Sequence, residues 1–202
     1  MNYDDFLKKY ETEARIKRSN AISVEVESYL SFKTGTMMEF GCTTGLIGFQ
    51  LKNKVNELFL VDSSKEMIEL VNHKIEKKSG MNITALHEEM LYADFHKEFD
   101  VIYVPLSLHH NKDVQNIVNI LVNFLKKNGK FIVIDLLNDK RNLQKNGEKF
   151  EENIGFSIEE ITQILENSGL VEVIGRKFYS SYKRTNESSQ PYSLFSIIGQ
   201  KP

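Results

Sequence analysis

The chain has 202 residues, 41% of them hydrophobic and 27% charged, with a formal net charge of −2, which is the composition of one globular domain and excludes a disordered chain. Its single cysteine, Cys42, excludes an internal disulfide, and no apolar run approaches the roughly 20 residues of a membrane span. Because basic and acidic residues are mixed along the chain, nothing indicates a nucleic-acid surface, and we expect a cytoplasmic protein with a small-molecule partner.

Residues 1–34 are expected to form one or two amphipathic helices that precede the main body of the domain. Their apolar residues recur at helical spacing, in the sets Phe6, Tyr10, Ala14 and Ile22, Val26, Tyr29, Leu30. The remaining residues, 35–202, contain no internal repeat and no linker that would mark a second domain. The sequence therefore predicts a single domain, 1–202, with a helical leader.

From residue 35 onward, short apolar runs alternate with amphipathic helices. The runs are TMMEF (36–40), LFLVD (58–62), NITAL (82–86), FDVIYV (99–104) and KFIVID (130–135). Such alternation predicts a parallel sheet with helices on both faces. Two more strand-like runs follow Gly169 and flank a polar stretch, which predicts a closing antiparallel hairpin. The expected fold class is therefore α/β, with seven strands that are mostly parallel.

Three of the predicted helices have recognisable ends. Residues 63–66 (SSKE) and 157–160 (SIEE) each have the pattern of a capping box, with a serine at the cap and a glutamate three residues later. A third helix is expected to begin near Asp113. It is expected to stop at residues 128–129 (NG), where a left-handed cap costs little.

The segment MEFGCTTGLIG, residues 38–48, follows the first strand and contains Gly41, Gly45 and Gly48. A strand, a glycine-containing turn and a helix bring unpaired N–H groups and the positive end of a helix to one point, which suits a nucleotide or a carboxylate. Asp62 ends the next strand 21 residues after Gly41, where an acid can accept hydrogen bonds from a ribose diol. Each feature alone also fits an ordinary turn or helix cap, but together they favour a nucleotide site.

The spacing of the glycines indicates which nucleotide class fits. The dinucleotide fingerprint G-x-G-x-x-G would need glycines at Thr43 and Leu46, so a nicotinamide oxidoreductase is disfavoured. The register acid-x-G-x-G-x-G fits at Glu39, Gly41 and Gly45, with Thr43 as the departure and Ile47 in place of a weakly required last glycine. The loop resembles that of the class I S-adenosylmethionine-dependent methyltransferases of the small-molecule type. The segments LFLVDSSKEMIELVNHKI, ALHEEMLYADFHKEFDVIYVPLSLHH and LKKNGKFIVIDLLND resemble the later motifs of that family, in the same order.

The resemblance implies a Rossmann-like, doubly wound sheet in which residues 35–202 form the core that binds the cofactor S-adenosyl-L-methionine. It implies that Asp62 holds the ribose hydroxyls, that Met67 lies near the adenine, and that Glu89 faces the adenine amino group with Met90 beside the ring. The full set of cofactor contacts that it implies is Glu39, Gly41, Cys42, Thr43, Gly45, Asp62, Ser63, Met67, Glu89, Met90 and Pro105.

Thr43 leaves two possibilities open at the centre of the loop. If its φ angle is negative, the β-branched side chain costs little; if φ is positive, backbone strain should weaken cofactor binding. Thr43 also suggests an alternative function, in which the domain binds the cofactor or a partner without catalysis.

The implied reaction is an in-line methyl transfer, which needs alignment of an acceptor atom with the activated methyl and requires no metal. His109 and His110 follow the fourth strand, at the edge where α/β sheets bind ligands, and one of them could deprotonate an acceptor. They could equally begin the next helix and face solvent. Pro105 stands in VPLS, which lacks the Asn-Pro-Pro-Tyr type of motif, so methylation of nucleic acid is disfavoured.

The long segment after Asp135 carries four basic residues, Lys140, Arg141, Lys145 and Lys149. They are candidates for attracting an anionic substrate, or for an ordinary solvated surface. The sequence identifies neither the methyl acceptor nor its accepting atom, and it leaves the oligomeric state unknown.

Overall fold

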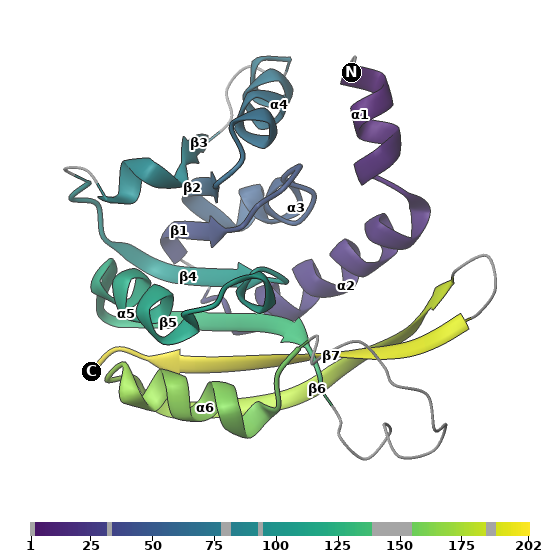
Figure 1. The fold of residues 1–202 in the computed structure, drawn as a ribbon. Coiled ribbons are helices and arrows are strands. Elements are labelled where there is room, and N and C mark those ends of the chain that lie inside the picture. Colours follow the sequence, from purple (N-terminus) through teal and green to yellow (C-terminus); the bar gives the residue numbers. More distant parts are fainter. Residues whose placement is uncertain (1–2, 32–33, 78–81, 93–94, 139–154, 185–188) are drawn as a thin grey trace.

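The fold was analysed in a computed structural model that describes residues 3–31, 34–77, 82–92, 95–138, 155–184 and 189–202 (Figure 1). Its centre is one seven-stranded sheet with the strand order β3-β2-β1-β4-β5-β7-β6. The strands are β1 (Thr34–Phe40), β2 (Val55–Asp62), β3 (Ile83–His87), β4 (Phe99–Pro105), β5 (Leu125–Leu136), β6 (Val171–Arg184) and β7 (Ser189–Gln200).

The pairing of the strands confirms the predicted fold class. Strands β1 to β5 pair in parallel, whereas β7 is antiparallel to both β5 and β6. From β1 the chain continues to β2 and β3 on one side, whereas from β4 it continues to β5 on the other side. The connections that follow β1 and β4 therefore lead away from each other. In open α/β sheets a ligand binds at such a point, outside the carboxyl ends of the strands.

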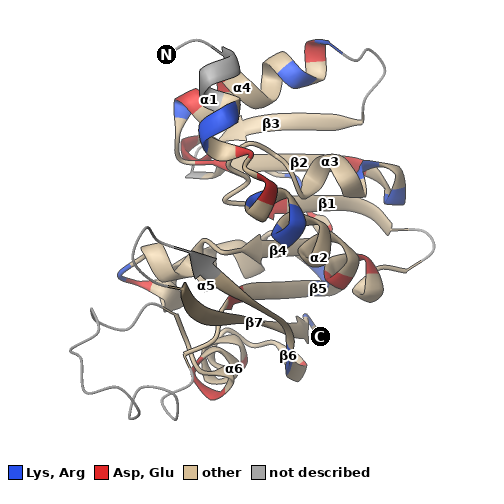
Figure 2. Ribbon diagram, turned by 90° about the vertical axis from the view of Figure 1, so that its right-hand side faces the viewer, with Lys and Arg blue, Asp and Glu red and all other residues tan. Residues whose placement is uncertain are grey.

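Six α-helices lie around the sheet within the described ranges: α1 (Tyr3–Tyr10), α2 (Glu13–Tyr29), α3 (Gly48–Leu51), α4 (Lys65–Glu76), α5 (Val114–Asn123) and α6 (Ile158–Asn167). Short 3-10 helices occur at η1 (Lys52–Lys54), η2 (Glu88–Tyr92) and η3 (Leu108–His110). None of the helices in these ranges combines the length and the apolar character needed to cross a membrane. Basic and acidic segments are interleaved over the ribbon (Figure 2).

The two faces of the sheet are covered by different helices. Val118 of α5 packs with Phe131 of β5 in one core, which also takes in α6. Ile22 of α2 and Val71 of α4 pack with Ile132 of β5 in the other core. Neighbouring strand residues point to opposite faces, so a strand buried on both faces has the unbroken apolar run that the sequence displays.

The capping box predicted at Ser63 is wrong, although the one at Ser157 is confirmed. Helix α4 is capped by Ser64, whose Oγ accepts the N–H of Met67 at 3.3 Å. Asp62 accepts the N–H of Ser64 at 2.9 Å, and this contact extends the turn by one residue. At α6, Ser157 and Glu160 bond to each other's N–H as a capping box requires.

Helix α5 begins after Asp113 as predicted but ends at Asn123, before the Asn128–Gly129 pair. The residues from Leu125 onward belong instead to β5, which pairs with β4 through Phe99. Asn128 still takes the left-handed conformation, with φ of 60°, but inside a stretch where the β4–β5 register shifts. The Asn128–Gly129 pair therefore correctly indicated a left-handed backbone position, but it does not mark the end of α5.

The leader helix α2 is joined to the C-terminal hairpin by a buried carboxylate. Glu25 accepts two hydrogen bonds from Arg176 of β6, at 2.9 and 3.0 Å, and one from Ser196 of β7 at 2.5 Å. Tyr29 donates a further hydrogen bond at 3.0 Å. Burial raises the pKa of Glu25, but these donors outweigh it and leave the pKa below its ordinary value. Helix α2 is thus part of the folded core.

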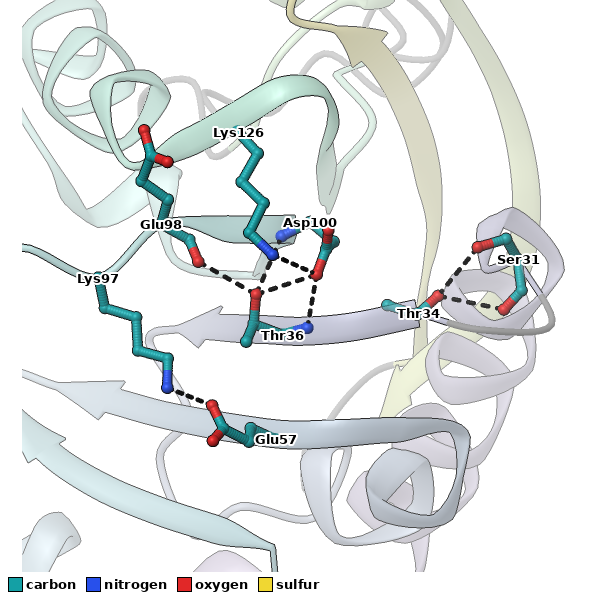
Figure 3. Close-up of polar contacts among 8 residues, drawn as sticks. All are labelled: Ser31, Thr34, Thr36, Glu57, Lys97, Glu98, Asp100 and Lys126. Carbon is teal, nitrogen blue, oxygen red and sulfur yellow. Dashed lines mark hydrogen bonds and ion pairs between the residues drawn. The ribbon is translucent and has the colours of Figure 1, made fainter.

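A second polar cluster joins strands at the opposite edge from the glycine loop (Figure 3). Asp100 of β4 accepts hydrogen bonds from the N–H of Thr36 of β1 at 2.7 Å and from its hydroxyl at 3.0 Å. Lys126 pairs with the same carboxylate at 2.9 Å, and the pKa of Asp100 is lowered because these donors outweigh its burial. The central strands are therefore held in register at their amino-terminal edge.

Glu25→Gln should lower the free energy of unfolding by about 2 kcal/mol at pH 7, because the charged acceptor of four hydrogen bonds is lost. The lowered pKa of Glu25 means that its contribution is present above the unfolded pKa and is lost as the pH falls through the folded value. Urea unfolding at pH 7 and at acid pH measures both effects. Glu27→Gln, at an exposed pair with Lys54 on the same helix, is the control and should cost less than about 0.5 kcal/mol. Equal losses of unfolding free energy for the two variants would contradict the role of Glu25 as a stabilising contact between α2 and the C-terminal hairpin.

Candidate functional site

The glycine loop begins where β1 ends, and its backbone lies close to neighbouring elements. The N–H groups of Gly41 and Cys42 both donate to the carbonyl of Val61, at 2.8 and 3.0 Å, which fastens the loop to β2. Gly41 has φ of 84°, and a Cβ there would stand 2.5 Å from the Ser107 hydroxyl. Gly45 has φ of 76°. Glycine is therefore required at both positions of the predicted register.

Glu39, the acid of the loop register, lies beneath the loop and is 1% exposed. Its carboxyl group accepts the Tyr103 hydroxyl at 2.6 Å and the N–H of Gly48 at the start of α3. Burial raises the pKa of Glu39 to about 8, while these two hydrogen bonds lower it and the charge of Asp62 raises it. At pH 7 Glu39 is therefore mostly neutral.

Thr43 has φ of 50°, so the structure selects the strained alternative of the two that the sequence leaves open. In this conformation the N–H of Thr43 donates to Oδ2 of Asp62 at 2.7 Å. The other carboxylate oxygen, Oδ1, accepts the N–H of Ser64 at 2.9 Å. Asp62 thereby connects the loop after β1 with the start of α4.

A pocket of about 180 Å³ opens between this loop and the end of β4. Six of the sequence-predicted site residues line it: Glu39, Gly41, Cys42, Thr43, Pro105 and His110. Its other lining residues are Tyr10, Arg15, Arg18, Ser19, Thr44, Leu46, Ile47 and Leu106. The predicted residues Gly45, Asp62, Ser63, Met67, Glu89, Met90 and His109 do not line this pocket.

The predicted residues at the ends of β2 and β3 form a second group, connected to the pocket through the Thr43–Asp62 hydrogen bond. His87 contacts the carbonyl of Ser63 at 2.9 Å, and its Nδ1 lies 3.4 Å from a carboxylate oxygen of Glu89. The Glu89 side chain is 77% exposed. Met90 is also exposed, whereas Met67 is buried. The exposed members of this group, Glu89 and Met90, lie outside the pocket lining.

The two histidines after β4 have different environments. His109 places Nδ1 2.5 Å from Oδ1 of Asp135, a fully buried residue of β5. His110 lines the pocket, and its ring centroid is 4.0 Å from that of His109. Burial lowers the pKa of His110, the charge of His109 lowers it further, and Asp135 opposes the shift.

Sequence reasoning missed Arg15 and Arg18, which reach the pocket from α2. Residues 1–34 were expected to form a helical leader outside the cofactor core. The spacing of their apolar residues does not indicate that polar residues of α2 line a pocket beside the glycine loop. Tyr103 and Asp135 were also missed. A polar residue inside an apolar strand run is the signal that could have identified each, because burial demands a partner.

Other chemical features of the site are limited. Within the described ranges, no group of three or more His, Cys, Asp or Glu side chains could hold a metal ion. Burial raises the pKa of the Cys42 thiol well above its ordinary value, so this cysteine is not an activated nucleophile. The basic residues predicted as a substrate wall, Lys140, Arg141, Lys145 and Lys149, lie outside the described residues.

Glu39→Gln should change how stability depends on pH. Unfolded chains ionise Glu39 above about pH 4.5, whereas the folded protein retains the proton up to about pH 8, so wild-type stability falls as pH rises between these values. Glutamine does not ionise, so the variant should not lose stability in this way. The free energy of unfolding of the variant minus that of wild type should therefore increase with pH, by at most about 1.4 kcal/mol per pH unit. Urea unfolding from pH 5 to pH 8 measures the difference, with exposed Glu69→Gln as control. A difference independent of pH would contradict the buried, protonated state.

Thr43→Gly should raise the free energy of unfolding by about 1 kcal/mol, because glycine adopts the positive φ of this position without the steric cost of a β-branched residue. Thermal and urea unfolding provide the measurement. Thr43→Ala keeps a Cβ and should recover less than half of the gain. A stability gain with alanine that equals the gain with glycine would show that the side chain, rather than φ, is responsible.

The chain is similar in sequence to known methyltransferases. A family model described as a methyltransferase domain matches residues 31–179. An uncharacterised methyltransferase of Schizosaccharomyces pombe is 25% identical over 225 residues, which cover 96% of this chain and 77% of the relative.

Solved structures share the fold. An S-adenosylmethionine-dependent methyltransferase from Aquifex aeolicus has a TM-score of 0.69 and 17% identity, with 100% of both chains covered. Magnesium protoporphyrin IX methyltransferase from Synechocystis, solved with bound S-adenosylhomocysteine, has a TM-score of 0.66 and 12% identity, over 93% of this chain and 83% of that one. Since the family model covers well over half of the sequence, the chain belongs to the methyltransferase-domain family that this model describes.

Proposed function

We propose that the protein transfers a methyl group from S-adenosyl-L-methionine to a small-molecule acceptor. The observation that carries this proposal is the pocket between the glycine loop and the end of β4, with the Asp62 carboxylate hydrogen-bonded to the same loop. A nucleoside with an amino-acid extension can span these two places. S-adenosylmethionine supplies a methyl group activated by its sulfonium sulfur.

Asp62 has the capacity to hold the ribose. Its two carboxylate oxygens accept one hydrogen bond each, from Thr43 and Ser64, and a carboxylate can accept about four. Two acceptor positions therefore remain for a diol. Nearby, the ring of His87 and the side chains of Glu89 and Met90 provide polar and apolar surface for the adenine.

Arg15 and Arg18 are suited to hold the carboxylate of the amino-acid end. Both line the pocket from α2, where the Arg15 guanidinium also lies 5.4 Å from the centre of the Tyr10 ring. Glu39 beneath the loop is mostly neutral at pH 7 and does not compete for these guanidinium groups. A guanidinium beside a pocket favours a carboxylate, which it can bind through two parallel hydrogen bonds.

The residues at the end of β4 shape the place of transfer. Pro105 and Leu106 form an apolar wall opposite the loop, and Leu106 is fixed by donating its N–H to the carbonyl of Ile134 at 2.7 Å. An apolar wall limits the directions from which an acceptor can approach, and alignment of this kind is the main requirement of an in-line transfer.

Calorimetric titration tests the proposal with ligands that share part of the cofactor. S-adenosylhomocysteine should bind with a micromolar dissociation constant, and NAD should give no heat. Asp62→Asn should weaken binding of S-adenosylhomocysteine and of 5′-methylthioadenosine by tenfold or more each, because both contain the ribose. Arg18→Gln should weaken binding of S-adenosylhomocysteine alone by about tenfold, because 5′-methylthioadenosine lacks the amino-acid end.

Lys17→Gln is the matched control for the arginine variant. Lys17 is an exposed residue of the same helix and does not line the pocket, so its removal should leave both affinities unchanged. Binding of NAD with no binding of S-adenosylhomocysteine would refute the cofactor assignment. Cofactor binding without transfer of labelled methyl to any fraction of a metabolite extract would favour the alternative of a non-catalytic binding domain.

A further inference from the structure

The junction of α1 and α2 places positive charge beside the pocket. Tyr10, the last residue of α1, and Arg15, in the first turn of α2, both line the pocket. Thr12 caps α2, and its side chain accepts the N–H of Arg15 at 3.4 Å. Arg18 follows Arg15 by three residues, so the two side chains share one face of the helix, and it also lines the pocket. Two guanidinium groups therefore reach the same pocket from one helix face.

The ring of Tyr10 attracts the Arg15 guanidinium without using its hydrogen-bond donors. The guanidinium lies 5.4 Å from the centre of the ring, and the ammonium group of Lys9 lies 5.2 Å from the same centre. An aromatic face attracts a cation through its quadrupole. Such a contact consumes none of the five N–H donors of a guanidinium, whose planar arrangement matches a carboxylate or a phosphate.

The two arginines differ in exposure, and this difference separates their roles. Arg15 is exposed, whereas Arg18 is partly buried. A residue that lines a pocket and is also exposed stands where the pocket meets solvent, which is the side from which an acceptor enters. Arg18 lies deeper, and one guanidinium can hold the carboxylate of the cofactor through two parallel hydrogen bonds. Arg15 is then available to a second anion.

The charges around the pocket favour a negatively charged acceptor. S-adenosylmethionine has a sulfonium, an ammonium and one carboxylate group, so it adds net positive charge to a pocket that already has two guanidinium groups. Among the described residues that line the pocket, Glu39 is the only carboxylic acid, and its raised pKa of about 8 keeps it mostly neutral at pH 7. Like charges a few ångströms apart repel each other, and an anionic acceptor offsets this repulsion.

Two acids near the pocket have partners other than Arg15. Glu11, which directly follows Tyr10, pairs with Lys74 of α4, and Lys74 also donates to the carbonyl of Thr44 at 2.7 Å. Asp62 accepts the N–H of Thr43 and is assigned to the ribose in the proposed function. Neither carboxylate is among the described residues that line the pocket.

We propose that the methyl acceptor is an anion and that Arg15, beside the Tyr10 ring, binds its carboxylate or phosphate group. The inference rests on the proposed function and deepens it by naming the class of acceptor. The positive field of the two guanidinium groups also attracts such an acceptor from solution.

Ligand-observed NMR titration of protein saturated with S-adenosylhomocysteine tests the proposal. The probes are benzoate, phenyl phosphate and uncharged benzamide, which share one ring and differ in charge. At least one of the two anions should bind about tenfold more tightly than benzamide, because only an anion can pair with Arg15. Tighter binding of phenyl phosphate would assign an acceptor with a phosphate group, and tighter binding of benzoate would assign an acceptor with a carboxylate.

Two variants of α2 show whether Arg15 is responsible for the preference. Arg15→Gln should weaken binding of the preferred anion by about tenfold and leave benzamide binding unchanged. Lys17→Gln removes the same charge from an exposed residue of the same helix that does not line the pocket, and it should leave anion binding unchanged.

Three results would overturn the inference while S-adenosylhomocysteine still binds. They are failure of both anions to bind, equal affinity for the anions and benzamide, and anion binding that is the same in wild type and in Arg15→Gln. Failure of S-adenosylhomocysteine to bind would instead refute the proposed function, and the inference with it.

Discussion

The carboxylate of Asp62 is the contact on which the geometry of the site depends. It brings the N–H of Thr43 and the N–H of Ser64 to its two oxygens, and so joins two segments that follow different strands. The first bond holds Thr43 in a left-handed conformation that a β-branched residue would otherwise avoid. The second moves the start of α4 from Ser63 to Ser64. A single side chain thus sets the shape of the glycine loop and the start of the next helix.

Three buried acids of this protein are stabilised in different ways, and the differences follow from their partners. Glu39 has only a hydroxyl and a backbone N–H, so burial prevails and the carboxyl group is mostly neutral at pH 7. Glu25 has a guanidinium partner and two hydroxyl donors, Ser196 and Tyr29, and its pKa is lowered. Asp135 is compensated by an imidazole ring and two backbone N–H groups. Acids in the same sheet therefore serve as a neutral support beneath the loop, a connection to the leader helix, and the partner of a histidine beside the pocket.

Most of the fold could be predicted from the sequence, because strands buried on both faces produce apolar runs and Ser157 with Glu160 marks a helix start directly. The register of Glu39, Gly41 and Gly45 located the loop, since positive φ and close contacts demand glycine at particular positions. The predictions that were wrong, the end of α5 and the cap of α4, concern features set by contacts between residues distant in sequence. The end of α5 is set by pairing of Leu125 with Phe99, and the cap of α4 by Asp62. Arg18 could not be assigned, because its place beside the loop is known only once α2 is packed there. For Asp135 the apolar run around it indicates burial, but its partner His109 is known only from the fold.

The position of β7 between β5 and β6 has a consequence for the order in which the sheet can be completed. Strand β6 is made before β7, yet among the described strands β7 is the one that pairs with it, so β6 joins the sheet only after residues 189–200 have been synthesised. Glu25 of the leader helix likewise waits for Arg176 and Ser196, which follow it by 151 and 171 residues. Long-range pairings of this kind form late and slow folding. During translation the parallel strands can therefore assemble first, while the face that receives α2 stays incomplete until β7 has left the ribosome.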